Sequence, residues 1–360
     1  MPSSLNIWFV LVVSISVLIS WTSLIGESGK SSAPSAPGVS SVTLASSFDD
    51  ELSLDFDFYR ETCPQAEAIV RSSMARIYSE HQDVSAALLR LFFHDCFIEG
   101  CDASVLLDDS NGDKNSSIER QAIPNKTLKG FDKIDLIKEE LEKACPGVVS
   151  CADTVSIATR DGIVLAGGPF YPVLTGRRDS SHSYYVEALA EIPRPDDNVT
   201  QTLHLFGLRG FDERETVSLL GAHNIGKIGC EIIQQRLSDF KGTGQPDPTI
   251  ALDFLTEMRL KCQDSTSDPS SVDLQTLSSG AGFGTHYYRS LLMGRGLLFA
   301  DQQLMTEEKT ARLVRAYASD DGSTFRMDFA RALMKMSSLG VLTGSKGQVR
   351  RNCSLPLVPF

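Results

Sequence analysis

The sequence lacks an excess of basic residues. Its 34 lysines and arginines are outnumbered by 46 aspartates and glutamates, so the formal net charge is −12 and the isoelectric point lies near 5.0. Binding to nucleic acid or to an anionic membrane surface depends on clustered positive charge, and the composition argues against both kinds of partner. With 42% hydrophobic and 22% charged residues, the chain has an ordinary globular composition and can bury a sizeable core.

Side-chain charge is absent from residues 1–26, and most of Ile7 to Ile25 is apolar. This segment predicts a secretory signal peptide over residues 1–26. Because it has no positively charged start and is long enough to cross a bilayer, an uncleaved membrane anchor is the alternative. Residues 27–50 are rich in Ser, Pro and Ala and predict a disordered linker, followed by one folded domain over residues 51–360.

The eight cysteines include no C-x-x-C pair, the spacing typical of structural zinc sites. A zinc site made from His94 and cysteines therefore fails on spacing. An even number of cysteines behind a signal-like start predicts four disulfides in an oxidising compartment, although sequence alone allows 105 pairings. Glycosylation sequons at Asn115, Asn198 and Asn352 fit a secreted glycoprotein.

Strand signals are few and short, the clearest being Phe170 to Leu174, and no internal repeat is visible. Apolar residues instead recur at the three- and four-residue spacing of amphipathic helices. The segments with this spacing are Ala66–Ser79, Val84–Phe93, Phe131–Cys145, Ser150–Ala166, Val199–Leu208, Thr216–Cys230, Ala311–Ser319 and Thr324–Ser337. The pattern predicts an all-α domain, built as two helical lobes.

The segment Arg90 to Leu107 concentrates chemically active side chains. Arg90 and His94 are four residues apart on the second of these helices, so both point to one face, with Phe93 beside them. A fixed cation next to a titratable imidazole is costly on an otherwise apolar helix unless it has a use. The pair is therefore a candidate site for handling a small anion or a proton.

Directly after this helix, Asp95, Asp102 and Ser104 lie around a short Cys96 to Cys101 interval. Carboxylate, hydroxyl and backbone carbonyl oxygens are the hard ligands that calcium prefers. The alternative interpretation is a capped helix end with a disulfide-closed turn.

A second candidate lies on the predicted helix that ends at Cys230. Asp212 and Glu215 have the spacing of an N-cap and its capping-box partner. His223 shares a face with Leu219 and Leu220 further along. A single histidine on an apolar face is more often a core residue than a ligand, so the residues alone leave both interpretations open.

Several motifs, in this order along the chain, resemble those of the plant secretory (class III) haem peroxidases. They are RLFFHDCFIEGCDAS (Arg90–Ser104), CPGVVSCAD (Cys145–Asp153), GRRD (Gly176–Asp179), LGAH (Leu220–His223) and RNC (Arg351–Cys353). The resemblance covers roughly residues 54–353. It implies an all-α, two-lobed helical peroxidase fold with haem b between a distal and a proximal lobe.

On the distal side, the resemblance implies that His94 is the acid/base group and that Arg90 stabilises developing charge, with Phe93 alongside. Asn125 would accept a hydrogen bond from His94 and link it onward to Glu119. Because Asn125 is also part of a sequon, a glycan is the alternative use of this residue.

On the proximal side, the resemblance implies that His223 is the axial ligand of haem iron and that Asp301 accepts from its other ring nitrogen. Pro193 resembles the substrate-access proline of the family. The other histidines, namely His81, His182, His204 and His286, match no motif and are expected to be surface or structural residues.

The resemblance also implies a distal calcium ion. Its ligands would be the side chains and carbonyls of Asp95, Ile98, Gly100, Asp102 and Ser104, with Glu119 acting through water.

The proximal calcium set departs from the family. Asn224 stands where Thr or Ser is usual, and Gln275 and Gly284 stand where two aspartates are usual. Loss of charged oxygen ligands lowers affinity for calcium, so we expect the second ion to be weak or absent. The alternative is that the loop, which is one residue longer than usual, is aligned differently and supplies Asp273 as a ligand.

The family pairing of cysteines implies the disulfides Cys63–Cys145, Cys96–Cys101, Cys151–Cys353 and Cys230–Cys262. The implied function is a secreted, monomeric peroxidase that reduces hydrogen peroxide to water and oxidises small phenolic donors in one-electron steps. Its expected location is extracellular or the cell wall, with the vacuole as the alternative. A haem-binding cell-wall protein with weak or lost turnover is the alternative function.

Overall fold

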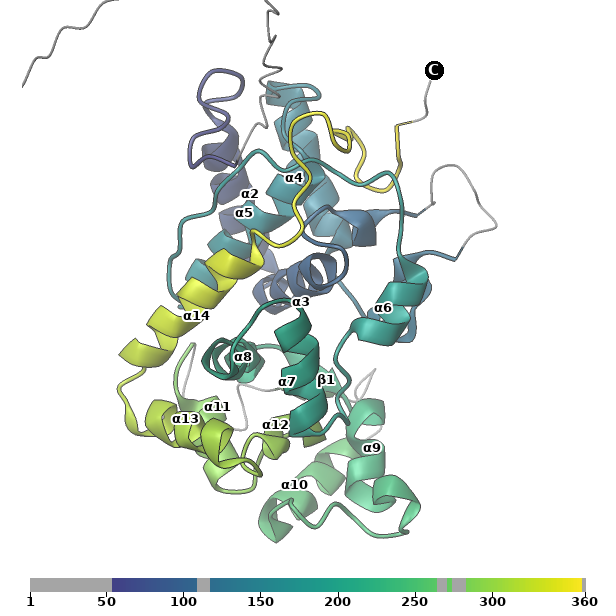
Figure 1. Ribbon diagram of the computed structural model, residues 1–360, viewed down its shortest axis with the longest axis vertical. Coiled ribbons are helices and arrows are strands. Elements are labelled where there is room, and N and C mark those ends of the chain that lie inside the picture. Colours follow the sequence, from purple (N-terminus) through teal and green to yellow (C-terminus); the bar gives the residue numbers. More distant parts are fainter. Residues whose placement is uncertain (1–53, 109–116, 264–270, 274–282, 358–360) are drawn as a thin grey trace, which may run out of the picture. The chain divides into compact units, whose positions relative to one another are not determined.

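The computed structural model describes residues 54–108, 117–263, 271–273 and 283–357 (Figure 1). The predicted signal peptide and linker, with their boundaries at residues 26 and 50, lie outside the described residues. So do Asn115 and Gln275.

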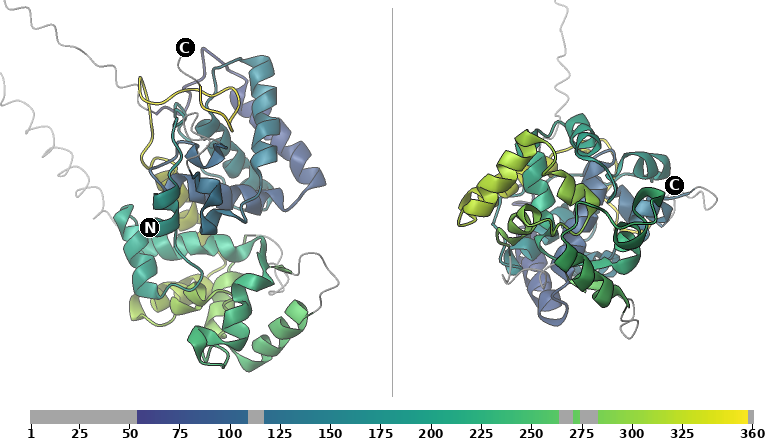
Figure 2. Two further views of the ribbon diagram at one scale, coloured as in Figure 1. Left: turned by 90° about the vertical axis from the view of Figure 1, so that its right-hand side faces the viewer. Right: turned by 90° about the horizontal axis from the view of Figure 1, so that it is seen from below.

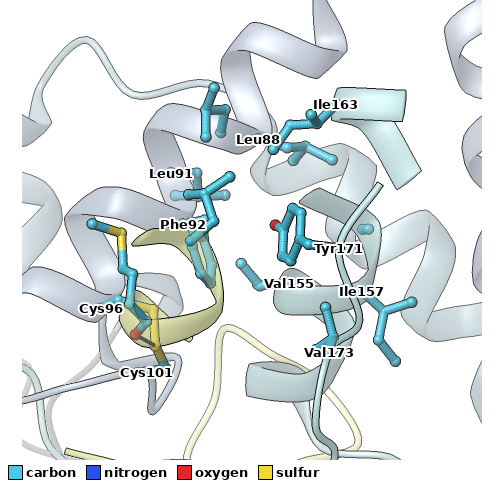
Figure 3. Close-up of a cluster of buried hydrophobic side chains, with 14 of the residues drawn as sticks. Leu88, Leu91, Phe92, Cys96, Cys101, Val155, Ile157, Ile163, Tyr171 and Val173 are labelled. Carbon is cyan, nitrogen blue, oxygen red and sulfur yellow. Dashed lines mark hydrogen bonds between the residues drawn. A yellow bond between two sulfur atoms is a disulfide. The ribbon is translucent and has the colours of Figure 1, made fainter. Parts of the chain in front are cut away.

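One group of helices comes from the first half of the chain: α2 (Ala66–Glu80), α3 (Val84–Phe97), α4 (Phe131–Ala144) and α5 (Cys151–Leu165). α2 and α3 both pack against α5, and α2 also packs against α4. Leu88, Phe92, Val155 and Tyr171 meet in the shared core (Figure 3). Burial of each large apolar side chain contributes roughly 1.5–3 kcal/mol, so this core fixes the orientation of α3.

The second group carries most of the remaining helices: α7 (Val199–Leu208), α8 (Glu213–Leu220), α9 (Cys230–Ser238), α10 (Leu252–Gln263), α11 (His286–Leu292), α12 (Phe299–Gln303), α13 (Glu308–Ser319) and α14 (Ser323–Met336). α8 packs against α13 and α14, and α11 packs against α13. α14 also contacts α3 and so joins the two groups, which Figure 2 shows from other sides. The all-α, two-lobed prediction is confirmed.

Shorter elements lie between these helices. The 3₁₀ turns η1 (Ser104–Leu106), η2 (Glu119–Gln121) and η3 (Ile123–Asn125) follow α3, and α6 (Tyr185–Glu191) packs against η2 and η3. The 3₁₀ turns η4 (Gly221–Asn224) and η5 (Phe240–Gly242) follow α8 and α9.

Within the described ranges, the strands are β1 (Lys227–Gly229) and β2 (Ser271–Asp273), paired antiparallel with Ile228 opposite Val272. The strand predicted at Phe170 to Leu174 does not form. That segment has no regular secondary structure, and the nearest strand-like pairing is a single bridge between Asp55 and Thr175. Tyr171 and Val173 are buried in the helical core, whereas Phe170 is exposed.

The helix predicted over Thr216 to Cys230 is also wrong. α8 ends at Leu220, the chain tightens into η4, and a new helix begins at Cys230. Two glycines lie at the break. A Cβ atom on Gly221 would lie 2.4 Å from Phe325 and from the hydroxyl of Tyr288, and Gly226 has a left-handed φ of +102°. The chain therefore passes close to α11 and α14 here and then turns away.

All four expected disulfides form, and no cysteine is free. Cys151–Cys353 joins residues 202 positions apart and ties the C-terminal segment to the start of α5. Such a cross-link stabilises the fold chiefly by restricting the unfolded chain. Among the described helices, none combines the length and apolar character that crossing a bilayer requires.

Candidate active site

α3 presents Arg90, Phe93 and His94 on one side, as their spacing predicts. This helix extends four residues beyond the predicted end, to Phe97. Nη2 of Arg90 donates to the carbonyl of Pro124 over 2.8 Å. Phe93 meets the ring of His94 edge-on, with 5.7 Å between ring centroids. η3 therefore anchors the arginine while the phenylalanine supports the imidazole.

A short hydrogen-bond relay fixes the tautomer of His94. Nδ1 of His94 lies 2.6 Å from Oδ1 of Asn125, and Nδ2 of Asn125 donates to the backbone carbonyl of Glu119 over 2.8 Å. Because that carbonyl can only accept, the amide of Asn125 must turn its oxygen toward His94. Nδ1 then carries the hydrogen, and Nε2 keeps a free lone pair.

The surroundings of His94 disfavour its protonation. Burial, and then the charge of Arg90, lower the pKa of His94 to about 3, against a smaller opposing effect of the bond to Asn125. Burial also lowers the pKa of Arg90 to about 10, which leaves it charged at neutral pH. The pair is therefore a neutral base beside a permanent cation.

On the other side, the turn after α8 presents His223. α8 starts with the predicted capping box, in which Asp212 and Glu215 bond to each other's backbone N–H groups. Nδ1 of His223 lies 2.8 Å from Oδ1 of Asp301 on α12, and Asp301 is buried. Burial opposes protonation of His223, but Asp301 outweighs it, so the pKa of His223 is raised. Nδ1–H faces the carboxylate, and Nε2 is available to a metal.

The electrostatic environment of His223 includes Arg90 of α3, whose charge lowers the pKa of His223, although by less than Asp301 raises it. Both side chains are accessible, with 36% of the His223 side chain exposed, although burial shifts the pKa of each. A free imidazole nitrogen on one side and an arginine–histidine pair on the other are the donor set that a histidine-ligated haem needs.

Pro193 is half-buried and lies in the loop before α7. The carbonyl of Pro195 in this loop accepts from the backbone N–H of Ala300, next to Asp301. The loop is therefore tied to the helix that supports His223. A separate hollow of about 610 Å³, lined by Ile69, Arg76, Glu140 and Lys143 among others, contains none of the expected site residues.

The expected distal calcium ligands form a buried oxygen cluster beyond α3. Asp95, Asp102, Ser104 and Glu119 are each at most 2% exposed. Oδ1 of Asp95, Oγ of Ser104 and Oε2 of Glu119 have no hydrogen-bond partner. Buried polar atoms are normally satisfied, so three unpartnered oxygens in one cluster fit a bound cation.

Electrostatics agree with this fit. Burial, and then the neighbouring Asp102, raise the pKa of Asp95, and burial raises the pKa of Asp102 to about 7. Carboxylates so disposed need a cation to stay ionised. Within the described ranges, no group of three or more His, Cys, Asp or Glu side chains converges as a metal site would. Calcium here would therefore depend on Ser104 and on the carbonyls of Ile98 and Gly100 as well.

The proximal candidate Asn224 behaves differently. It is fully buried, and both ends of its amide bond to protein: Nδ2 to the carbonyl of Gly221 over 2.9 Å and Oδ1 to the N–H of Tyr287 over 3.3 Å. Of the other two expected positions, Gln275 lies outside the described residues, and Gly284 carries no side chain to bind an ion. The donor set described on this side does not fit a calcium ion.

Sequence reasoning missed three residues near these sites. The hydroxyl of Tyr287 donates to Oδ1 of Asp301 over 2.9 Å, and Nε2 of His286 lies 3.1 Å from the carbonyl of Asn224. Arg350 is buried beside the distal cluster and donates to the carbonyl of Ala103 over 2.6 Å. None of the three lies in the quoted motifs. Arg350 directly precedes the RNC motif, and this position was the only signal that the sequence offered.

Comparison with known proteins agrees with this geometry. The family model described as Peroxidase matches residues 70–320. The chain is 45% identical to Putative Peroxidase 48 of Arabidopsis thaliana, over 88% of this chain and 89% of that protein. It is 40% identical to Peroxidase 57 of the same plant, over 82% and 90%. It is 42% identical to Peroxidase 71, over 82% and 88%.

These matches cover most of the chain and most of each relative, and they identify the protein as an oxidoreductase of the peroxidase type. The chain therefore belongs to the plant secretory (class III) haem peroxidase family.

Proposed function

We propose that the protein reduces hydrogen peroxide to water and oxidises small phenolic donors in one-electron steps. Hydrogen peroxide takes up two electrons and two protons to give two molecules of water. Two phenol molecules each give up one electron and one proton. The observation that carries the proposal is the fixed tautomer of His94, whose free Nε2 lies on the side of α3 that also carries Arg90.

The distal residues would manage protons and charge. Nε2 of His94 accepts a proton from one peroxide oxygen and delivers it to the other, which then leaves as water. Arg90, which stays charged, stabilises negative charge on the departing oxygen. Asn125 keeps the imidazole in the required tautomer, and Phe93 limits its rotation.

The proximal residues would hold the cofactor. Haem b, when bound, supplies the redox centre that exchanges electrons with peroxide and with the phenol. His223 would bind the iron through Nε2, and Asp301 would fix the opposite nitrogen and increase the electron density of the imidazole. Pro193 would line the access path of the donor. A calcium ion at Asp95, Ile98, Gly100, Asp102 and Ser104, with Glu119 through water, would stiffen the end of α3.

We also infer that the protein is secreted to the extracellular space or cell wall. Four disulfides support an oxidising compartment. The inferred signal peptide, residues 1–26, and the linker, residues 27–50, precede the catalytic domain over residues 51–360.

The test compares the full-length protein with His94→Ala after haem loading, in an assay of peroxide-dependent phenol oxidation. Loss of the acid/base group should lower the rate by roughly 10²–10⁴-fold, while the haem absorption spectrum is retained. His204→Ala, an exposed histidine of α7, is the control and should keep full activity.

A second variant tests the proximal residue. His223→Ala should fail to retain haem, and added imidazole should restore part of the haem spectrum. A wild-type protein that binds haem but whose spectrum does not respond to peroxide would favour the alternative function, a haem-binding cell-wall protein.

A further inference from the structure

In the turn that follows His223, protein groups pair both ends of the Asn224 side-chain amide. Asn224, the last residue of η4, is fully buried. Its Nδ2 donates to the carbonyl of Gly221, which can only accept, and its Oδ1 accepts from the N–H of Tyr287, which can only donate. The orientation of the amide is therefore fixed by its partners, and neither end is left without one.

The backbone carbonyl of Asn224 is occupied as well. Nε2 of His286, the first residue of α11, lies 3.1 Å from this oxygen. Since a carbonyl can only accept, Nε2 must carry the hydrogen. An imidazole N–H thus points at an oxygen that could otherwise have served as a ligand.

The neighbourhood of His286 is built for an imidazole. Gly284 leaves the space open: a Cβ atom there would lie 3.5 Å from Nδ1 of His286, so a longer side chain would project toward the ring.

The contrast with the distal cluster is direct. There, Asp95, Ser104 and Glu119 each keep a buried oxygen without a partner. In the proximal segments that the structure describes, no side-chain atom of Gly221–Asn224 or His286–Leu292 is buried without a partner. The distal side has the vacant oxygens that a cation requires, whereas in these two proximal segments the buried polar side-chain atoms are paired.

We propose that His286 and Asn224 form a protein clamp that takes the place of a metal ion behind His223. The clamp joins η4 to the start of α11 by two hydrogen bonds, which Asn224 accepts from His286 and Tyr287. A third bond, from Asn224 to Gly221, braces η4 itself. The chain accordingly binds one calcium ion per molecule, at the distal cluster. That count, but not the clamp itself, rests on the distal calcium ion of the proposed function.

The clamp is tested by hydrogen exchange of the full-length protein. In His286→Ala, amide exchange in a peptide covering residues 221–229 should be at least fivefold faster than in wild type, and excess calcium should not restore it. His286→Gln, whose side-chain amide can also donate to the carbonyl of Asn224, should stay closer to wild type. Unchanged exchange in His286→Ala would overturn the clamp, and so would full restoration of slow exchange by calcium.

Metal analysis of the same preparations tests the ion count. After gel filtration in calcium-free buffer, wild type and His286→Ala should each hold one calcium ion, and Asp95→Asn should hold none. Two tightly bound ions in wild type would contradict the replacement of the proximal ion. A wild-type protein that holds no calcium would instead contradict the distal site of the proposed function. Hydrogen exchange in His286→Ala would then be the test of the clamp.

Discussion

Tyr287 and His223 share one acceptor, Oδ1 of Asp301. The hydroxyl of Tyr287 donates to this oxygen over 2.9 Å, and Nδ1 of His223 lies 2.8 Å from it. Burial, and then the adjacent charge of Asp301, raise the pKa of Tyr287, so the phenol stays protonated and remains a donor. The phenol withdraws part of the negative charge that Asp301 would otherwise lend to His223.

Tyr287→Phe should therefore make the His223 imidazole more electron-rich and lower the ferric/ferrous potential of the loaded protein. We expect a shift on the order of tens of millivolts, since 59 mV corresponds to tenfold in a one-electron equilibrium. Tyr288→Phe is the matched control, because the hydroxyl of Tyr288 donates to the carbonyl of Val217 instead. If Tyr287→Phe and Tyr288→Phe changed the potential of wild type by the same amount, Tyr287 would not act through Asp301. Spectroelectrochemical titration measures both.

The environment of His94 predicts a flat acid limb of the pH profile. With its pKa lowered to about 3 by burial and by Arg90, His94 remains an unprotonated base well below the ordinary histidine value of about 6.5. The rate constant of peroxide consumption should stay level from about pH 5 to pH 8. Stopped-flow measurement across this range provides the check.

A variant and a stability measurement sharpen this prediction. Arg90→Leu removes a charge that lowers the pKa of His94. The inflection at the acid end of its pH–rate profile should therefore move to higher pH. Between about pH 3 and pH 6.5 the unfolded chain binds more protons at this residue than the fold does. The stabilisation linked to His94 is therefore complete above about pH 6.5 and is lost as the pH falls toward 3. A rate that falls with an inflection near pH 6.5 in wild type would contradict the lowered pKa.

Calcium removal should destabilise the distal side. An ion at a hundredfold excess over its dissociation constant contributes about 2.7 kcal/mol to the free energy of unfolding, and Asp95→Asn should remove most of it. We expect chelation to lower the unfolding temperature of wild type by roughly 5–10 °C and to change Asp95→Asn little. Asp132→Asn, at an exposed carboxylate, is the control and should respond to chelation as wild type does. Equal unfolding temperatures of wild type with and without chelator would rule out a structural ion at this cluster.

Whether the sequence alone predicts a contact in the site depends on how far apart the two residues are along the chain. The pairing of Arg90 with His94 follows from helix geometry, because four residues make one turn. The contact of His94 with Asn125 and that of His223 with Asp301 cross 31 and 78 positions. Those contacts could be expected only through the family resemblance, since no local rule brings such distant residues together.

The errors in the predicted fold have a similar origin. An apolar period of three to four continues through Gly221 into the following turn, but the helix ends where Phe325 and Tyr288 leave no room beside Gly221. Phe170 to Leu174 has the composition of a strand, yet its neighbours in space are helices. His286 and Tyr287 reveal their contacts with Asn224 and Asp301 only once α11 is placed beside η4. Local pattern thus identifies elements, and long-range packing decides where they end and what they support.

The sequons should divide into occupied and unoccupied sites according to the freedom of the side-chain nitrogen to which a glycan attaches. Asn125 is 2% exposed, and its Nδ2 donates to Glu119. Asn198 and Asn352 are exposed. In each, Oδ1 of the side chain accepts a hydrogen bond, from the backbone N–H of Gln201 and of Ser354 respectively. After expression through a eukaryotic secretory pathway, peptide mass spectrometry should find glycan at Asn198 and Asn352 and none at Asn125.

The N-cap role of Asn198 supplies a matched pair of variants. Asn198→Asp removes the glycan site and keeps an oxygen that can accept from the N–H of Gln201, so stability should change little. Asn198→Ala removes both and should cost about 1 kcal/mol. Each variant should lose one glycan mass. A glycan on Asn125 would mean that its amide is not committed to Glu119 and His94, and this would remove the structural basis for the His94 tautomer.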